Sequence, residues 1–155
     1  MASLFASLSF PTTVAPCIFQ VLWLKLCVNC CINAITAIHD APNKHALDLL
    51  ASSEGAPPGL RESLVSELVA VGNLDLASLG SAFRLSPPLV LEAAGRVAEL
   101  TAGNVNSTLQ DVRSGRVTEI RALNGYVVRR GGELGVDTPA NAWLVEKVEA
   151  LRPSS

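Results

Sequence analysis

The amino-acid sequence predicts an all-α domain. Apolar residues recur at spacings of three and four along several segments, and glycine or proline separates those segments. No run alternates apolar and polar residues for long enough to predict a strand. The 155 residues, 49% of them hydrophobic, suit one domain with a core that needs neither disulfides nor a metal.

The first helix is expected over residues 18–38, which are almost entirely apolar. The stretch 14–38 is long enough to be scored as a membrane span. Lys25 near its middle would cost about 3 kcal/mol on insertion scales, and Asn29 and Asn33 add to that cost. A buried helix of a soluble domain explains the same run without this cost, so a small membrane-anchored protein is the weaker interpretation.

Two helices are expected in the next part of the chain. Residues 44–52 form a short one, and SSEGAPPG at 52–59 is a loop because glycine and proline break helices. The apolar residues of 60–71 again recur at three and four, and Gly72 and Asn73 are typical of a helix end.

Helix caps mark the following pair of helices. Ser86 is a typical N-cap, and Pro87 and Pro88 open a helix that runs to Ala102. Residues 104–113 are then expected to form a short helix.

The last two helices are marked in the same way. Residues 118–134 carry apolar side chains on one face, and Gly135 closes this helix. Thr138 caps the final helix, Pro139 opens it, and it is expected to end near Leu151.

Residues 1–17 precede the expected helical domain at 18–152. They form a leader whose function the sequence leaves uncertain. Its first 16 residues are rich in serine and threonine and carry no charge. A secretory signal would begin with positive charge, and organelle transit peptides normally carry arginine. We expect a cytoplasmic protein, with organellar targeting by this leader as the weaker alternative.

Four cysteines stand at positions 17, 27, 30 and 31, and the rest of the chain has none. A disulfide framework is not expected, because no cysteine downstream is available for pairing. Cys27 and Cys30 form a CxxC pair, but the sequence shows neither the βαβ setting of a redox motif nor the regular ligand spacing of a zinc site. We expect free, mostly buried thiols, no metal, and a reducing compartment.

The charge balance of the chain argues against nucleic acid as a partner. Twelve basic residues stand against 14 acidic ones, so the formal net charge of -2 gives no field that would attract nucleic acid. Only 17% of the residues are charged and the aliphatic content is high, which excludes disorder of the whole chain.

Lys25, Asn29 and Asn33 are spaced four residues apart on the first expected helix. Each step turns about 40° around the helix axis and advances about 6 Å, so the three lie on one polar stripe. The asparagines could bond neighbouring carbonyls, and the lysine could extend to solvent. The stripe would also suit a substrate with a carboxylate or a carbonyl group.

A second polar cluster lies in residues 104–125, where Asn104, Ser107 and Glu119 are the uncommitted groups. Ser107 could cap a helix, and Glu119 could favour the helix dipole in the first turn after Thr118. Taken singly, each of these side chains has an ordinary structural explanation. The remaining charged residues could form local ion pairs; they are Asp111, Arg113 and Arg116.

Together the two clusters closely resemble the C-terminal domain of the ketopantoate reductases, also called 2-dehydropantoate 2-reductases. The resemblance runs from residue 23 to the end of the chain. It rests on the lysine–asparagine–asparagine spacing and on the segments STLQD (107–111), TEI…LNG (118–125) and GVDTPAN (135–141), which follow one another in the family's order. It implies a helical bundle and the NADPH-dependent reduction of 2-dehydropantoate to pantoate, on the route to pantothenate and coenzyme A.

The resemblance also implies roles for single residues. Lys25 would stabilise the oxyanion that develops on the substrate and would supply its proton. Glu119 would contact the substrate hydroxyl and the lysine, and its charge would help to keep the lysine protonated. The substrate-binding positions would be Asn29, Asn33, Asn104 and Ser107.

Three positions depart from the family's pattern. Ala34 stands where proline is usual, and Thr108 stands where methionine is common. Arg121 stands where aspartate usually follows the TEI segment, which reverses a charge two positions from Glu119.

The largest departure concerns the cofactor. The family begins with a Rossmann domain whose GxGxxG turn binds the pyrophosphate of NADP(H). No such motif occurs here, since Gly131, Gly132 and Gly135 lie inside or at the end of an expected helix. We therefore expect this chain alone to be inactive.

Two hypotheses follow. In the first, the chain is the catalytic-residue part of a reductase, working as a homodimer or with a Rossmann domain that lies elsewhere. In the second, it is a stand-alone, non-enzymatic helical module for binding or oligomerisation.

Overall fold

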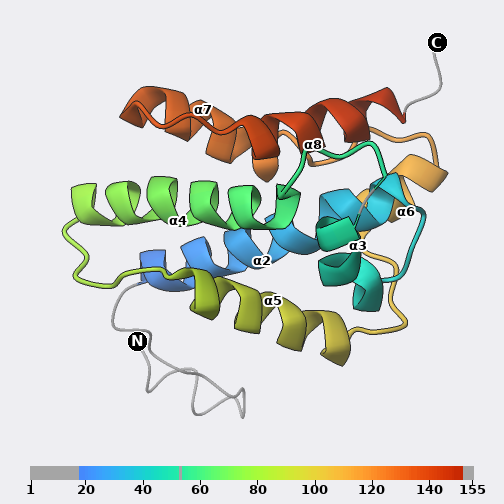
Figure 1. Ribbon diagram of the computed structural model, residues 1–155, viewed down its shortest axis with the longest axis horizontal. Helices are drawn as coiled ribbons and strands as arrows, with labels where there is room; N and C mark the ends of the chain where they lie inside the picture. The colour runs from blue at the N-terminus through green and yellow to red at the C-terminus, as the bar shows by residue number, and fades with distance from the viewer. Residues whose placement is uncertain (1–17, 53, 152–155) are drawn as a thin grey trace, which may run out of the picture.

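The computed structural model describes residues 18–52 and 54–151, and the predicted leader 1–17 lies outside them. This part of the chain forms seven α-helices and one short 3-10 helix (Figure 1), which confirms the predicted all-α fold. The elements in order are α2 (Ile18–Ile38), η1 (Asn43–His45), α3 (Ala46–Ser52), α4 (Leu60–Ser78), α5 (Pro87–Leu100), α6 (Ser107–Arg113), α7 (Asn124–Leu134) and α8 (Pro139–Ala150).

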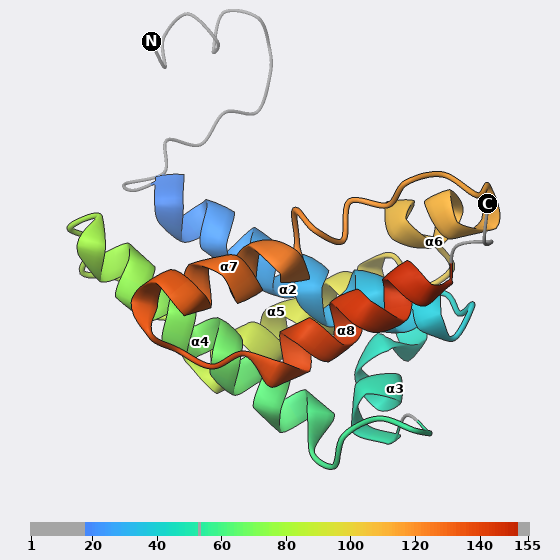
Figure 2. The same cartoon turned by 90° about the horizontal axis from the view of Figure 1, so that it is seen from above.

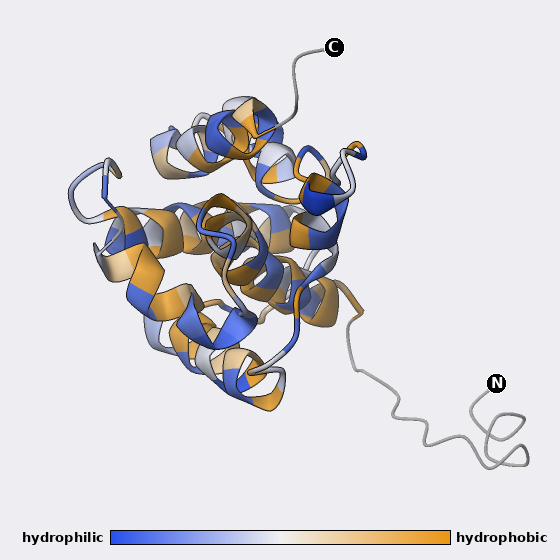
Figure 3. Cartoon of the chain, turned by 90° about the vertical axis from the view of Figure 1, so that its right-hand side faces the viewer, coloured by the Kyte–Doolittle hydropathy of each residue, from blue (hydrophilic) through white to orange (hydrophobic). Residues whose placement is uncertain are grey.

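Helix α2 is the centre of the bundle. It contacts α3, α4, α5, α6 and α8, and Figures 1 and 2 show it running between α5 on one side and the α7–α8 pair on the other. Its second half, from Cys30 to Ala37, is buried throughout. Hydrophobic and hydrophilic residues are mixed around the other helices (Figure 3), as expected for helices that pack one face on a shared core.

The apolar character of α2 is explained by this position. The helix is long and apolar enough to cross a membrane, and 61% of its most apolar window is buried inside the bundle. A core helix of a soluble protein meets the same test of length and composition. Neighbouring helices therefore account for the buried part of the apolar run, which begins at Trp23.

Helix α4 continues past Gly72 and Asn73 to Ser78, so the predicted helix end at these residues is wrong. A Cβ atom at Gly72 would lie 2.5 Å from Leu85 Cδ1 and 3.0 Å from Trp23 Cε3. The glycine allows close packing inside the helix. The side chain of Asn73 binds the main chain of Leu85, with its Oδ1 accepting from the amide at 2.7 Å and its Nδ2 donating to the carbonyl at 3.0 Å.

Helices α6 and α7 also begin later than predicted. The N-cap of α6 is Asn106, whose Oδ1 accepts a 3.1 Å hydrogen bond from the amide of Leu109. Ser107 is therefore the first residue of the helix and not its cap. Helix α7 begins at Asn124. Residues 120–123 form turns instead, and Ile120 and Leu123 pack into the core there.

Gly135 is the C-cap of α7, with a left-handed φ of 72°, as predicted. Of the two remaining predicted N-caps, Ser86 is confirmed, whereas Thr138 occupies the N-cap position without the predicted side-chain bond. Ser86 caps α5, since its hydroxyl accepts from the amide of Leu89. Thr138 makes no side-chain capping bond at α8. Its place is taken by Glu67 of α4, whose carboxylate accepts from the amides of Ala140 at 2.7 Å and Asn141 at 2.9 Å.

Cys27, Cys30 and Cys31 are free and buried, which confirms the prediction of free thiols for these three, while Cys17 lies outside the described residues. Burial raises the pKa of the Cys27 thiol to about 12 and raises the pKa of the other two thiols as well. Within 18–52 and 54–151, no three residues of the metal-binding types are grouped closely enough to hold a metal ion.

Candidate functional site

The polar stripe of α2 runs from the surface into the bundle. Lys25 is exposed, Asn29 is half-buried, and Asn33 is only 7% exposed. The three span about 12 Å along the helix, given a rise of about 1.5 Å per residue. Among the described residues, no side chain forms an ion pair or hydrogen bond with the Lys25 ammonium, so it is available to a ligand.

Ser107 and Glu119 meet at the surface. The Ser107 hydroxyl donates a 2.7 Å hydrogen bond to Glu119 Oε1, and both side chains are exposed. The contact joins the first residue of α6 to the turn before α7. Two of the residues singled out in the sequence are therefore side by side.

Asn106 places this pair beside α2. Its side-chain amide donates to Thr36 Oγ1 at 2.7 Å and to Asn43 Oδ1 at 2.9 Å. Thr36 lies one turn beyond Asn33 on α2, and its hydroxyl also contacts the Asn33 carbonyl at 3.3 Å. Ser107, next to Asn106 in the chain, is therefore held near the inner end of the stripe.

The segment that carries Glu119 leads to a pocket beside the start of α2. Ala122 lines this pocket together with Leu22 and Leu26 of α2. Leu26 follows Lys25 directly in the chain. Among the described residues, no hydrogen bond or ion pair joins Glu119 to Lys25, so the structure brings Glu119 to Ser107 and leaves the lysine apart from this pair.

Asn104 is not brought into this cluster by any hydrogen bond among the described residues. It is exposed, and its main chain is fixed by bonds from its amide to the Thr101 carbonyl and from the Asn43 amide to its carbonyl. Its predicted role in substrate binding remains a prediction.

Arg121 points its charge away from Glu119. Its guanidinium binds the carboxylate of Glu149 on α8, and this hydrogen bond raises the pKa of Arg121. The charge reversal at this position therefore leads to a pair with α8. Asp111 and Arg116 form the predicted local ion pair at 2.9 Å, whereas Arg113 reaches Asp40 at 2.8 Å.

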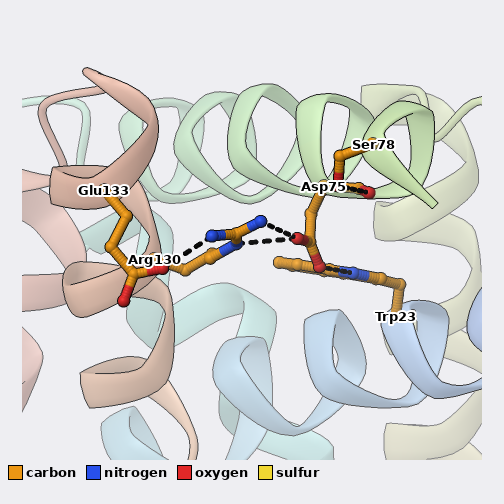
Figure 4. Close-up of polar contacts among 5 residues, drawn as sticks. All are labelled: Trp23, Asp75, Ser78, Arg130 and Glu133. Atoms are coloured by element: carbon orange, nitrogen blue, oxygen red, sulfur yellow. Dashed lines mark hydrogen bonds and ion pairs between the residues drawn. The ribbon is translucent and has the colours of Figure 1, made fainter.

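A further polar cluster, which the sequence analysis did not single out, is centred on Asp75 in the pocket between α2, α4 and α7 (Figure 4). Asp75 accepts from Trp23 Nε1 at 2.9 Å and from Arg130 Nε at 2.7 Å, and Arg130 also binds Glu133 at 2.6 Å. The hydrogen bonds to Glu133 and Asp75 raise the pKa of Arg130. The pocket has a volume of about 590 Å³ and is lined by Phe19, Leu22, Trp23, Leu26, Asp75, Leu79, Ala122, Tyr126, Arg129, Arg130 and Glu133.

The described residues do not fit a dinucleotide. A Rossmann site needs a strand, a glycine-rich turn and a helix N-terminus in succession. Over 18–52 and 54–151 there is no strand, and Gly131, Gly132 and Gly135 lie within α7 or at its C-cap. These residues therefore present no site for the pyrophosphate of NADP(H).

Residues 18–152 match the family described as ketopantoate reductase PanE/ApbA, C terminal. The chain belongs to this family. Ketopantoate reductase membership accounts for the helical fold and for the order of the motifs, and the chain spans about half the length of the curated relatives it matches.

Individual ketopantoate reductases support this placement. The 2-dehydropantoate 2-reductase of Vibrio cholerae is 36% identical over 154 residues, which cover 99% of this chain and 48% of that protein. The crystal structure of a ketopantoate reductase from Ralstonia eutropha matches with a TM-score of 0.73 and 31% identity, covering 97% of this chain and 46% of that one. A D-mandelate dehydrogenase solved with NADH and anilino(oxo)acetate shares the fold, with a TM-score of 0.71 at 24% identity over 97% of this chain and 77% of that one.

Proposed function

We propose that this chain is the substrate-binding helical domain of a 2-dehydropantoate 2-reductase. Lys25 and Glu119 are the proposed catalytic residues, and the proposed substrate-binding residues are Asn29, Asn33, Asn104 and Ser107. The observation that carries the proposal is the Ser107–Glu119 hydrogen bond beside the polar stripe of α2, in a chain that belongs to this family.

The chemistry of 2-dehydropantoate fits these side chains. Reduction adds a hydride to the carbonyl carbon, so negative charge develops on the carbonyl oxygen. The ammonium of Lys25, which has no partner among the described residues, would stabilise this charge and donate the proton that completes the alcohol. The amides of Asn29 and Asn33 and the hydroxyl of Ser107 would bind the polar groups of the substrate and orient it.

The hydride donor of the proposed reaction is NADPH, as in the family. Because the described residues present no dinucleotide site, the proposal includes a nucleotide-binding domain as a necessary partner. A homodimer is compatible with the same arrangement. Three buried, unpaired thiols support a reducing compartment, and we place the protein in the cytoplasm.

Titration of the chain with pantoate, followed by amide NMR, tests the proposal. We expect shift changes at the amides of Asn29, Asn33, Ser107 and Glu119. Lys25→Ala should weaken binding at least tenfold, because the only cation of the stripe is lost. Lys147→Ala is the matched control, since Lys147 is an exposed lysine on α8 beside Trp143.

Two outcomes would contradict the proposal: shift changes that map to another surface, or equal losses in the two lysine variants. Mixing the chain with NADPH and 2-dehydropantoate adds a further check. We expect no turnover without a nucleotide-binding domain.

The second candidate function is a non-enzymatic binding or oligomerisation module. It is favoured by the apolar start of α2, where Ile18, Phe19, Val21 and Leu22 are each between 41% and 55% exposed. The intact mass of the native protein distinguishes the two candidates. A mass near 16.3 kDa favours the module, whereas a mass larger by a nucleotide-binding domain favours the reductase.

A further inference from the structure

The described residues cover the first turns of α2 only in part. Gln20 donates a 3.4 Å hydrogen bond to the Ser81 hydroxyl, and Phe19 and Leu22 line the pocket. Ile18, Phe19, Val21 and Leu22 are exposed, and Trp23, at 4% exposure, is the first buried residue of the helix. Lys25 follows two residues later. The orientation of Lys25 therefore depends on how firmly Trp23 is anchored.

Trp23 is anchored on three sides. Its indole N–H donates to Asp75 Oδ2 at 2.9 Å, its ring packs against Gly72, and its centroid lies 6.0 Å from that of Tyr126. Residues two apart on a helix point about 200° apart around the axis. With Trp23 held in the bundle, Lys25 must face outwards on the opposite side.

Asp75 is itself held in place. Its side chain is 9% exposed, and Oδ1 receives both Nε and an Nη of Arg130 at 2.7 Å. Glu133 holds the other side of the same guanidinium, so a continuous chain of polar contacts runs from α7 through α4 to α2 (Figure 4). A buried carboxylate needs such a partner, because an unpaired charge inside a protein is costly.

We propose that Asp75 is a positioning residue for Lys25. Held by Arg130, it binds the Trp23 indole and so sets the rotation of the first turns of α2 about the helix axis. This inference rests on the proposed function only for the catalytic role of Lys25.

Small rotations matter at such a site. A turn of about 20° moves a group about 6 Å from the helix axis by about 2 Å. A misplacement of about 1 Å can cost on the order of 100-fold in rate. Loss of the anchor is therefore expected to affect Lys25 more than it affects the fold as a whole.

Substitutions that remove only the anchor provide the test. Trp23→Phe keeps an aromatic ring and removes the N–H donor. Asp75→Asn leaves one acceptor oxygen for the N–H donors of Trp23 and Arg130. Trp143→Phe makes the same change on α8. Glu67→Gln alters the other buried carboxylate of α4, which binds α8 and not α2.

The chain offers a direct probe, because it has only three lysines, Lys25, Lys44 and Lys147. Reductive methylation with ¹³C-formaldehyde gives each a separate dimethyl-lysine NMR signal, assigned by substitution. We expect Trp23→Phe and Asp75→Asn to shift the Lys25 signal and to leave Lys147 unchanged. Trp143→Phe should do the reverse, since the Lys147 ammonium lies 5.8 Å from the Trp143 ring.

Hydrogen exchange supplies the second measurement. Peptides covering residues 20–29 should exchange at least tenfold faster in Trp23→Phe and Asp75→Asn than in the two control variants at matched thermal stability. An unchanged Lys25 signal, or equal exchange in all four variants, would overturn the proposal. Both measurements are made without substrate, so a failure of the parent chain to bind pantoate would count against the proposed function and not against the anchor.

Discussion

The hydroxyl of Ser107 donates a 2.7 Å hydrogen bond to the carboxylate of Glu119, and this contact links two segments that periodicity places on separate helices. Neither side chain is needed to cap a helix or to fill the core. Asn106, and not Ser107, caps α6, and the Glu119 turn is anchored by Ile120 and Leu123. Both polar groups are exposed, so a ligand can reach them.

Removing the Ser107 hydroxyl should weaken the proposed site with little effect on the fold. We expect Ser107→Ala to reduce pantoate affinity about tenfold, because one hydrogen bond to a charged group is worth about 1.5 kcal/mol or more. Calorimetric titration measures the change. Ser114→Ala, at the exposed C-cap of α6, is the control, and an equal loss in both variants would contradict the assignment of Ser107.

Gly72→Ala should destabilise the protein, although alanine is the better helix former. The new Cβ would lie 2.5 Å from Leu85 Cδ1 and 3.0 Å from Trp23 Cε3, and overpacking of this kind costs about 1–3 kcal/mol. Gly132→Ala, in a helix with nothing within 4 Å of the new Cβ, should instead stabilise by up to about 1 kcal/mol. Urea denaturation measures both, and a stabilised Gly72→Ala would show that the packing at Trp23 is loose.

Thr108→Val should stabilise the protein by about 1 kcal/mol. The Thr108 side chain is fully buried, and its hydroxyl has no hydrogen-bond partner in the part of the chain that the structure describes. The substitution therefore removes an unsatisfied group at nearly constant shape. Thr36→Val is the matched control and should destabilise by about 1–2 kcal/mol, because its buried hydroxyl bonds Ile32 and Asn106. The same sign for both changes in thermal unfolding would contradict this account.

The buried thiols should resist alkylation in the native state. Burial raises the pKa of Cys27 from 9.0 to about 12, so the reactive thiolate is scarce at pH 8. We expect iodoacetamide to label Cys27, Cys30 and Cys31 only after urea is added, as read by peptide mass spectrometry. Rapid labelling of these three residues in the folded protein would contradict their burial.

The same thiols make stability fall at high pH. Their pKa is higher in the folded state than in the unfolded chain, so the unfolded chain loses protons first as the pH rises through 9.0. Their contribution is complete below pH 9 and declines above it, by up to about 1.4 kcal/mol per thiol and pH unit. Urea midpoints measured between pH 7 and pH 11 follow this change; a midpoint that rises above pH 9 would contradict it.

Local sequence signals were sufficient for the helices whose ends are set locally. The apolar run of α2 and the serine and proline residues at the start of α5 predicted those elements. The predicted end of α4 at Gly72 and the predicted start of α7 at Thr118 were wrong because tertiary packing sets both positions. Trp23 packs against Gly72, so the glycine lies within α4 and not at its end. Ile120 and Leu123 pack into the core, so α7 does not extend back to Thr118.

The candidate site was predictable in part. The period of the helix places Lys25, Asn29 and Asn33 on one stripe. It cannot predict a contact between Ser107 and Glu119, because these residues lie on separate segments. Only the resemblance to a family indicated that the five residues act together. The Asp75 cluster joins residues 52 and 55 positions apart in the chain. One feature of the sequence pointed to this cluster. Asp75 lies on the same helix face as the buried residues Leu68 and Val71, and a charged side chain on a buried face requires partners.

The carboxylate of Glu67 binds the first amides of α8, 73 and 74 positions further along the chain. Helix α8 thus has no side-chain cap of its own, and its first turn gains its hydrogen-bond acceptors only after α4 has formed and docked. A short helix is marginal in isolation, so the C-terminal helix should fold late and as one cooperative unit with α4. During synthesis the growing chain would complete α8 only once α4 had formed and docked.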